Sequence, residues 1–429
     1  MLMESLQTNI MQDRVDGNKL RFLLYCHDTF GLGHLRRAIS LATHFIETLP
    51  KAEVLIATGS SFAHSFVLPP RVDYVKLPAV TKMSSGGYRA RNLNMEFSTI
   101  RDLRATILRE TARAYRPDVF LVDHAPQGLK GEALSTLAML KYTQPACIRV
   151  LGLRDIVDAS NIIQKTWHEE GVYQTLEQDY DLILVYGSKE LYDIAEEYRL
   201  PASISHKLRY CGYLDRVKDT GQTEDPSRTD SPAQQLVVVT AGGGGDGFPL
   251  MRDYLLGLQQ LAAFPFTNVL LTGPLMDQGE QDDLRKLAAA LPADKVRIES
   301  FLPDPLPLLR AADLVVAMAG YNTVCELLAL KQRMLLVPRT VPRQEQMLRA
   351  AMLARHGLAQ MLSPDVLTPG SLIEKVQHSL SQPRPDSSQL IDAGISFKGQ
   401  ASARNAILEE IDHQSAQPWM IEQIVEQVA

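Results

Sequence analysis

The chain has 429 residues, a formal net charge of −6, and 45% hydrophobic and 22% charged residues. The length exceeds what one hydrophobic core supports, the composition excludes a disordered chain, and the acidic balance argues against nucleic acid as the main partner. We expect neither a signal peptide nor a membrane span, since no apolar run reaches the roughly 18 residues that a span requires. The four dispersed cysteines lack metal-binding spacing and are typical of a cytoplasmic protein with reduced thiols. They are Cys26, Cys147, Cys211 and Cys325.

The first half of the chain alternates short apolar runs with stretches of helical pattern. Strands that alternate with helices form parallel sheets covered by those helices, so this half is predicted to be a Rossmann-like α/β domain. The predicted strands are residues 22–26, 54–58, 72–77, 119–122, 147–151 and 182–186.

A polar segment then separates this half from a second one of the same plan. Residues 217–235 are rich in Asp, Thr, Ser, Pro and Gln, as in an exposed linker. We predict a cleft between the carboxyl ends of the two sheets as the ligand site. The predicted strands of the second half are residues 236–240, 269–272, 296–298, 314–317 and 334–337.

The predicted divisions are an N-terminal tail (1–19), a first domain (20–213), a linker (214–235), a second domain (236–385) and a C-terminal segment with a helix (386–429).

The first predicted strand leads into a turn that contains Gly31 and Gly33. These glycines permit a tight turn, and His34 follows at the start of a helix, where the helix dipole disfavours a charged imidazole. His34 is therefore a candidate general base. The alternative is a histidine that caps its own helix or contacts only a phosphate.

Asp123 and His124 follow the predicted strand at 119–122. They place a second acid and a second imidazole at the edge of the cleft, where either is a candidate to assist or replace His34 as the base. No zinc-protease helix, serine nucleophile elbow or P-loop lysine pattern is present, and no metal site is predicted.

A glycine loop opens the second domain. Residues 242–247 match the dinucleotide-binding spacing GxGxxG. A dinucleotide site also requires an acid at the end of the next strand to hold the ribose, whereas residues 271–274 read Leu-Thr-Gly-Pro. The amides of Gly243, Gly244 and Gly245 against a diphosphate are therefore the better interpretation, and NAD binding is the weaker one.

Residues 319–326 combine a glycine turn, a helix N-terminus and a carboxylate one turn into the helix. Gly320 provides the turn, Asn322 or Thr323 is placed to cap the helix, and the first-turn N–H groups point at an incoming anion. Glu326 is placed to accept hydrogen bonds from both hydroxyls of a ribose. The alternative is a buried turn in which Glu326 only completes a capping box with Thr323.

Glu345 and Gln346 lie where a loop becomes a helix, just beyond the last predicted strand. This position places them to hydrogen-bond the hydroxyls of a sugar. Ordinary surface polarity is the alternative.

One stretch of the chain is basic. Residues 82–116 contain eight basic and three acidic side chains. We interpret it as a solvated helix face, with a site for anionic lipid or a phosphorylated acceptor as the alternative.

These motifs together resemble the two-domain GT-B glycosyltransferases, and most closely the MurG-type, or glycosyltransferase family 28, UDP-N-acetylglucosamine transferases. The resemblance is carried by GLGHLRRA after the first strand, the glycine loop, ESFLPDPLPLLRAADLVVAMAGYNTVCELLAL and LLVPRTVPRQEQMLRA, and it covers the plan of most of residues 21–380. It implies two Rossmann-like doubly wound domains that face a cleft. It also implies transfer of N-acetylglucosamine from its UDP derivative to a lipid-linked acceptor.

The resemblance also implies roles for individual residues. Glu326 would hold the nucleotide ribose, and the pair Glu345 and Gln346 would contact the donor sugar. Phe301 and Leu302 would lie against the base, and His34 would lie on the acceptor side.

Two departures from the family pattern concern the substrates. The family usually carries Gly-Gly-His with a following Pro, whereas Arg36 and Arg37 follow His34 where this loop meets the acceptor. Glu345 replaces a frequent Gln. Both changes leave the fold and the nucleotide site as expected.

The predicted function is an inverting, metal-independent transfer of a sugar from a UDP-sugar to an acceptor hydroxyl, with no cofactor besides this co-substrate. The acceptor is a glycan, a lipid-linked molecule or a small molecule, and a peripheral contact with the inner face of the membrane is compatible with the basic stretch. A nucleotide-sugar hydrolase or epimerase, and a non-catalytic nucleotide-sugar-binding protein, are the alternatives.

Overall fold

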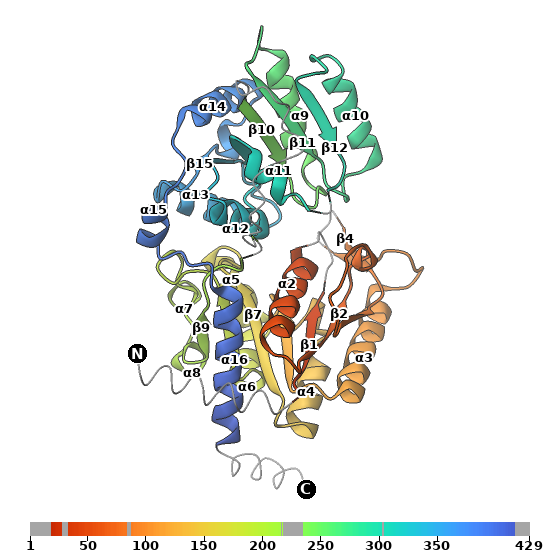
Figure 1. Ribbon diagram of the computed structural model, residues 1–429. Helices are drawn as coiled ribbons and strands as arrows, with labels where there is room; N and C mark the ends of the chain where they lie inside the picture. The colour runs from red at the N-terminus through yellow and green to blue at the C-terminus, as the bar shows by residue number, and fades with distance from the viewer. Residues whose placement is uncertain are drawn as a thin grey trace.

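The structure is a computed structural model that describes residues 19–27, 33–83, 87–215, 217, 235–302 and 304–416. Two α/β domains stacked one above the other make up these residues (Figure 1). The predicted tail and linker lie almost entirely outside the described residues, as does Gly31. No helix among the described residues is long and apolar enough to cross a membrane.

The first domain is built on a parallel sheet with the order β3-β2-β1-β6-β7-β8-β9 among the described residues. Its strands are β1 (Arg21–Cys26), β2 (Glu53–Thr58), β3 (Val72–Lys76), β6 (Val119–Asp123), β7 (Ile148–Arg154), β8 (Leu182–Tyr186) and β9 (Leu208–Tyr210). A separate antiparallel hairpin pairs β4 (Val80–Lys82) with β5 (Tyr88–Ala90). The helices are α2 (Gly33–Thr48), α3 (Phe97–Tyr115), α4 (Leu134–Thr143), α5 (Ser160–Glu169), α6 (Val172–Asp179), α7 (Ile194–Glu197) and α8 (Ala202–Ser205), with 3-10 turns at Ala63–Ser65 and Leu129–Gly131.

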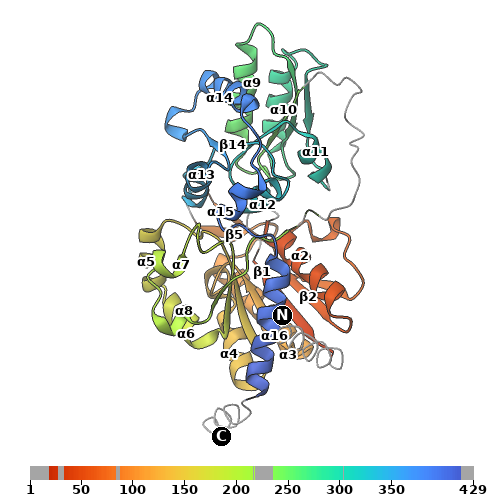
Figure 2. The ribbon, with the colours of Figure 1, turned by 60° about the vertical axis from the view of Figure 1, so that its left-hand side comes forward.

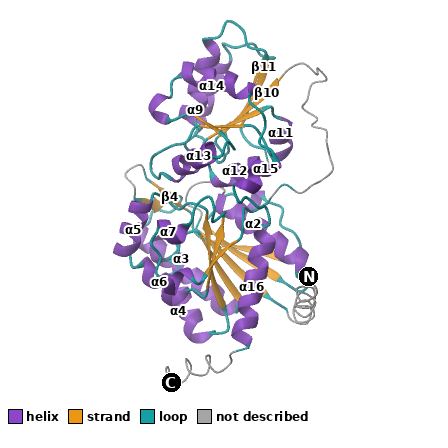
Figure 3. Cartoon of the chain, turned by 90° about the vertical axis from the view of Figure 1, so that its left-hand side faces the viewer, coloured by secondary structure: helices purple, strands orange, loops and turns teal. Residues whose placement is uncertain are grey.

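Both faces of this sheet are buried, as the near-continuous apolar strands predict. In β1, Phe22 and Leu24 pack toward α2, whereas Leu23 and Tyr25 pack toward α3 and α4. This alternation follows from the two-residue period of a strand. Figure 3 shows the resulting sandwich of strands between helices.

The second domain repeats the plan with the order β12-β11-β10-β13-β14-β15 among the described residues. Its strands are β10 (Gln235–Thr240), β11 (Phe266–Leu271), β12 (Val296–Glu299), β13 (Leu314–Ala317), β14 (Met334–Leu336) and β15 (Gln360–Met361). Its helices are α9 (Phe248–Gln259), α10 (Gln278–Ala288), α11 (Leu306–Ala311), α12 (Tyr321–Ala329), α13 (Glu345–Arg355), α14 (Pro369–Ser381) and α15 (Ser387–Asp392), with a 3-10 turn at Pro364–Val366.

The predicted strands therefore match the observed ones, with shifted ends. The strand predicted at 147–151 continues to Arg154 because Gly152 does not break it. A Cβ on Gly152 would lie 2.5 Å from the hydroxyl oxygen of Tyr186, so this glycine allows the close packing of Tyr186 on β7. The four cysteines are buried and reduced, as predicted.

The C-terminal helix α16 (Gly399–Ser415) returns to the first domain, where it packs against α2, β7 and β8 (Figure 2). Backbone hydrogen bonds fix this return, since Tyr213 N donates to Ser396 O at 2.8 Å and Gly399 N donates to Tyr213 O at 3.1 Å. These two bonds join Tyr213, at the end of the first domain, to the segment between α15 and α16.

The domains share a buried interface. One apolar cluster runs from the first domain through Tyr213 to Tyr321 of the second, and the two rings stack at 6.1 Å between centroids. At its centre Arg349 of α13 donates to both oxygens of Asp155, at 2.8 and 2.6 Å, and both side chains are fully buried. Among the described residues this is the one ion pair that either side chain forms, and it joins α13 of the second domain to the segment after β7 of the first.

We expect Arg349→Met to lower the free energy of unfolding by about 3–5 kcal/mol, because it leaves the Asp155 carboxylate buried without a counter-ion. The double variant with Asp155→Leu should recover most of this loss. Urea unfolding measures both effects, and Arg355→Met, an exposed arginine on the same helix, is the control. Equal losses for the single and double variants would contradict the assigned charge pairing.

Candidate functional site

Both sheets reverse their strand order at a point that faces the other domain. The first sheet reverses between β1 and β6, and the second between β10 and β13. Ligands of open α/β sheets bind beyond the carboxyl ends of the strands at such switch points. Gly33 and His34 follow β1, and Asp123 ends β6. The glycine loop follows β10, and Gly320 follows β13, so all four chain segments converge.

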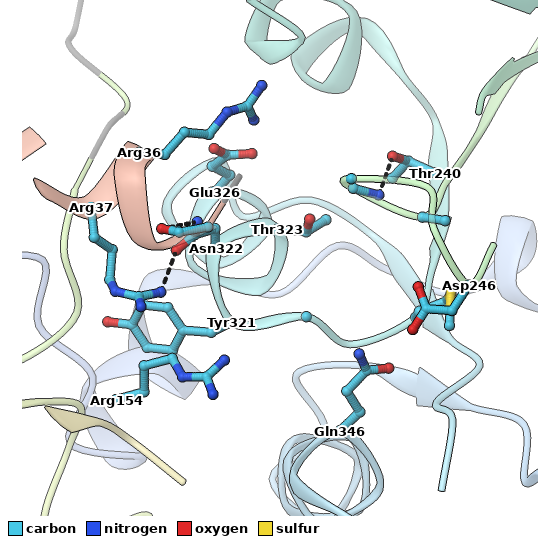
Figure 4. Close-up of a pocket in the computed structure, with 16 residues that line it drawn as sticks. Arg36, Arg37, Arg154, Thr240, Asp246, Tyr321, Asn322, Thr323, Glu326 and Gln346 are labelled. Atoms are coloured by element: carbon cyan, nitrogen blue, oxygen red, sulfur yellow. Dashed lines mark hydrogen bonds between the residues drawn. The ribbon is translucent and has the colours of Figure 1, made fainter. Parts of the chain in front are cut away.

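A pocket lies where these segments meet (Figure 4). The space between the lining residues is about 800 Å³, counting the part that is open to solvent. Both domains contribute to its wall. The lining residues are Gly33, Arg36, Arg37 and Arg154 from the first domain and Thr240, Ala241, Gly242, Gly243, Asp246, Met318, Gly320, Tyr321, Asn322, Thr323, Glu326 and Gln346 from the second.

A His–Asp–Arg cluster stands at the first-domain side of this pocket. His34 is the second residue of α2, and its Nδ1 lies 2.5 Å from Oδ2 of Asp123. Arg37, one turn later on the same helix, donates from Nε to Oδ1 of Asp123 at 3.0 Å and from Nη2 to Oδ2 at 2.7 Å. Asp123 is therefore the partner of His34 and not an independent base.

The electrostatics of the cluster keep Asp123 ionised. Burial raises the pKa of Asp123, but the Arg37 guanidinium and the hydrogen bond with His34 outweigh it and hold the pKa well below its usual range. Nη2 of Arg37 also lies 3.0 Å from Nδ1 of His34, and the tautomer that donates from Nδ1 to Asp123 leaves Nε2 as the acceptor nitrogen. The side chain of His34 is 13% exposed. His34 itself is not among the lining residues, whereas Gly33, Arg36 and Arg37 are.

The helix α12 begins in the opposite wall without a side-chain cap. Its N-cap is Gly320, so the expectation that Asn322 or Thr323 caps it is wrong. Asn322 instead donates from Nδ2 to Gly33 O at 3.1 Å, which joins the two domains at the pocket. An uncapped helix N-terminus keeps its first-turn N–H groups and its positive dipole end available to an anion.

The glycine loop contributes to the same wall, though not with all of the predicted residues. Gly243 and also Gly242 line the pocket. Gly244 is buried, and a Cβ there would lie 2.0 Å from Thr272 O, so Gly244 serves close backbone packing. Gly245 is exposed and outside the lining set.

Glu326 lines the pocket and is 4% exposed. The capping-box alternative does not hold, because α12 begins at Tyr321 and Thr323 is its third residue. Thr323 also lines the pocket. Figure 4 shows Arg36 and Glu326 at the same end of the pocket.

Glu345 and Gln346 are 4% and 7% exposed, so surface polarity is the wrong interpretation of this pair. Gln346 lines the pocket, whereas Glu345 lies behind it and accepts from Arg339 Nη2 at 3.2 Å. Arg339 also pairs with Asp246 of the glycine loop at 2.6 Å. The Oε2 atom of Glu345 is buried and has no hydrogen-bond partner among the described residues.

Phe301 and Leu302, which the resemblance placed against the base, are not among the lining residues of the pocket.

His124 is 3% exposed and has a left-handed backbone, with φ 68°. Arg154 approaches both ring nitrogens, with Nε 3.3 Å from Nδ1 and Nη2 2.5 Å from Nε2. Burial and then the charges of Arg154 and Arg343 hold the pKa of His124 well below its usual range. This environment makes His124 a neutral acceptor for guanidinium groups.

Several residues of the site were not singled out by the sequence analysis. Arg154 and Asp155 lie in no quoted motif, whereas Arg339, Arg349 and Tyr321 lie within quoted motifs but were given no role. The position of Arg154 directly at the end of a strand was the one signal that pointed to it.

In the basic stretch of residues 82–116, Arg104 does not lie on a solvated face, because it is fully buried and pairs with Glu132 at 2.6 Å.

Comparisons with known proteins agree with this geometry. Residues 237–400 match the glycosyltransferase family 28 C-terminal domain. A UDP-N-acetylglucosamine--N-acetylmuramyl-(pentapeptide) pyrophosphoryl-undecaprenol N-acetylglucosamine transferase from Streptococcus pneumoniae serotype 19F (strain G54) is 28% identical over 185 residues, which is 42% of this chain and 49% of the relative. The chain thus spans about half the length of the curated relatives it matches.

Solved structures show the fold. The crystal structure of Acinetobacter baumannii MurG has a TM-score of 0.57 at 13% identity and covers 91% of this chain and 99% of its own. A putative UDP-N-acetylglucosamine 2-epimerase from Listeria monocytogenes has a TM-score of 0.60 at 15% identity and covers 93% and 97%. The predicted GT-B architecture and the resemblance to MurG-type transferases are confirmed, and the choice between reactions depends on the site.

We expect Asp123→Asn to lower the free energy of unfolding near pH 7 by about 3–5 kcal/mol, because Arg37 loses its buried counter-ion. The pKa of Asp123 is depressed in the folded state. The wild-type ion pair therefore stabilises the fold above the unfolded-state pKa of about 3.9, and this contribution is lost as the pH falls through the folded value.

The stability difference between wild type and Asp123→Asn should therefore shrink below about pH 4. Urea unfolding between pH 3 and 8 measures it, with the exposed Asp102→Asn as control. A difference that stays constant with pH would show that the carboxylate charge is not what stabilises the cluster.

Proposed function

We propose that the protein is a glycosyltransferase that moves a sugar, an N-acetylhexosamine or a hexose, from a UDP-sugar to an acceptor hydroxyl. One observation carries the proposal. Helix α2, whose His34 contacts Asp123 of β6, and the uncapped start of α12 border one pocket from opposite domains. Glycosyl transfer needs a base for the acceptor hydroxyl and an anion site for the departing diphosphate, and these two features would supply them.

The second domain would bind the donor. The first-turn amides of α12 and the amides of Gly242 and Gly243 would hold the diphosphate. Glu326 would accept the ribose hydroxyls. Gln346 would contact the sugar, and the unpartnered Oε2 of Glu345 supports a role for this carboxylate toward the same group.

The first domain would supply the base. Nε2 of His34 would take the proton of the acceptor hydroxyl as its oxygen forms a bond to the anomeric carbon. The bond between that carbon and the diphosphate oxygen breaks, and UDP leaves. A single displacement of this kind inverts the anomeric configuration.

Asp123 would act as the positioning residue in this step. Its bond to Nδ1 selects the tautomer that leaves Nε2 as the acceptor, and its charge stabilises the imidazolium that forms. The positive end of α12 and the guanidinium of Arg36 in the pocket wall would balance the charge of the departing UDP, so the proposal includes no metal ion.

We expect UDP to raise the melting temperature of the protein and NAD to leave it unchanged, because α12 offers Glu326 for the ribose whereas residues 271–274 lack the acid of a dinucleotide site. Glu326→Ala should weaken UDP binding by about 1–3 kcal/mol, the range for hydrogen bonds to a charged group. Calorimetry with the exposed Glu374→Ala as control measures this loss. Stabilisation by NAD alone would refute the assignment of the donor site.

We expect His34→Ala to reduce the transfer rate from UDP-N-acetylglucosamine by about 10² to 10⁴, with UDP affinity nearly intact. Asp123→Asn should reduce the rate through the same proton transfer, and the exposed His64→Ala should not reduce it. Product analysis of radiolabelled donor with a panel of acceptors gives the rates. Consumption of the donor without any acceptor would instead favour the hydrolase or epimerase alternative.

A further inference from the structure

The turn that leads from β13 into α12 has an unfavourable local conformation. Ala319 has a φ of 61°, in the left-handed region that residues other than glycine rarely adopt. The next residue, Gly320, is the N-cap of α12, and no side chain caps the helix there. The local sequence therefore does not fix this turn. Strained backbone of this kind persists only where its surroundings hold it.

The first contact that holds the turn comes from Arg349 of α13. Its Nη1 donates to Ala319 O at 2.8 Å, while its Nε and Nη2 bind the Asp155 carboxylate of the first domain. All three residues are buried. Asp155 thus orients the guanidinium that holds the carbonyl of the turn, and the turn is tied to the first domain through one side chain.

Tyr321 makes the second connection to the first domain. It is the first residue of α12, and its buried hydroxyl donates to Tyr186 O, at the end of β8, at 2.9 Å. The guanidinium groups of Arg37 and Arg349 stand 5.6 and 5.8 Å from its ring centroid, within the range of a cation–π interaction. Figure 4 shows Arg37 beside this ring. Tyr213 of the first domain stacks on the same ring.

The pocket side of the turn is open. Gly320 lines the pocket, and a Cβ there would meet no other part of the described chain within 4 Å. Ala319 is fully buried and does not line the pocket. The contacts that hold the turn therefore leave its pocket side free for a ligand.

We propose that Tyr321 is a positioning residue of the donor site. Through it the first domain holds the turn at Ala319 in the conformation that aims the first-turn amides of α12 into the pocket. This inference rests on the proposed function, because it concerns the site assigned there to the diphosphate of UDP. The affinity for UDP then depends on contacts between the domains, although the amides and Glu326 all belong to the second domain.

The strain at Ala319 sets the size of the effect. When the contacts are removed, the turn relaxes out of the left-handed conformation, and UDP binding has to restore it. The apparent affinity then falls by the fraction of molecules in which the turn is still competent. Ala319→Gly removes the cause of this loss, because glycine adopts positive φ without a steric cost.

The test measures UDP binding to the full-length protein by calorimetry and the stability of each variant by urea unfolding. Tyr321→Leu should weaken UDP binding by about fivefold to thirtyfold, the range that corresponds to the cost of a left-handed alanine. Tyr321→Phe keeps the ring and loses one hydrogen bond, so it should weaken binding by about threefold. Adding Ala319→Gly to either variant should return the affinity to within about twofold of the wild type, without restoring the lost ring contacts or the hydrogen bond.

Tyr321 lines the pocket, so a second position separates positioning from direct contact with UDP. Tyr213→Leu removes the ring that stacks on Tyr321, and Tyr213 is outside the lining residues. It should weaken UDP binding by about threefold or more, and Ala319→Gly should reverse this loss as well. Tyr254→Leu is the matched control, since Tyr254 is a fully buried tyrosine of α9 outside the pocket wall. It should lower stability and keep the UDP affinity within about twofold.

Unchanged UDP affinity in both leucine variants, together with lower stability, would show that these rings only stabilise the fold and would overturn the inference. A loss of affinity that Ala319→Gly does not reverse would overturn it too. If the leucine variants do not fold, Tyr321→Phe with and without Ala319→Gly decides in the same way. Absence of UDP binding in the wild type would instead refute the proposed function itself.

Discussion

The guanidinium of Arg37 connects the two halves of the site. It is 2% exposed, holds both oxygens of Asp123 within the first domain, and lies 3.5 Å from Oδ1 of Asn322 in the second. It also stands over the ring of Tyr321, 5.6 Å from its centroid. The charge of Arg37 keeps Asp123 ionised, and ionised Asp123 orients His34. The same side chain thus sets the chemical state of the proposed base and its position relative to the start of α12.

The general architecture was predictable because it depends on local pattern. Short, near-continuous apolar runs predicted the central strands, and glycines at strand ends predicted the turns that face the cleft. Short edge strands such as β9 (Leu208–Tyr210) and β15 (Gln360–Met361) were missed because two or three residues show no period.

The site was predictable only in part, because spacing indicates which sheet edge a residue reaches but not which charges meet there. His34, Asp123 and Glu326 were found since each follows a strand or begins a helix. The pairing of His34 with Asp123 spans 89 residues, and that of Arg349 with Asp155 spans 194. Such long-range pairing leaves no local trace, so the sequence left open whether Asp123 assists or replaces His34, and the structure places Asp123 in contact with His34.

Charge compensation also separates structural from functional arginines in this fold. Arg37, Arg104 and Arg349 are buried, and each binds a buried carboxylate, which is the arrangement that a stable interior requires. Arg154 and Arg343 depart from this rule at the point where the two domains and the proposed base meet. Arg154 and Arg343 are partly exposed, so water can take the place of a carboxylate at their N–H groups. The fold therefore pairs the arginines that are closed to solvent and leaves Arg154, in the pocket wall, open to water or a ligand.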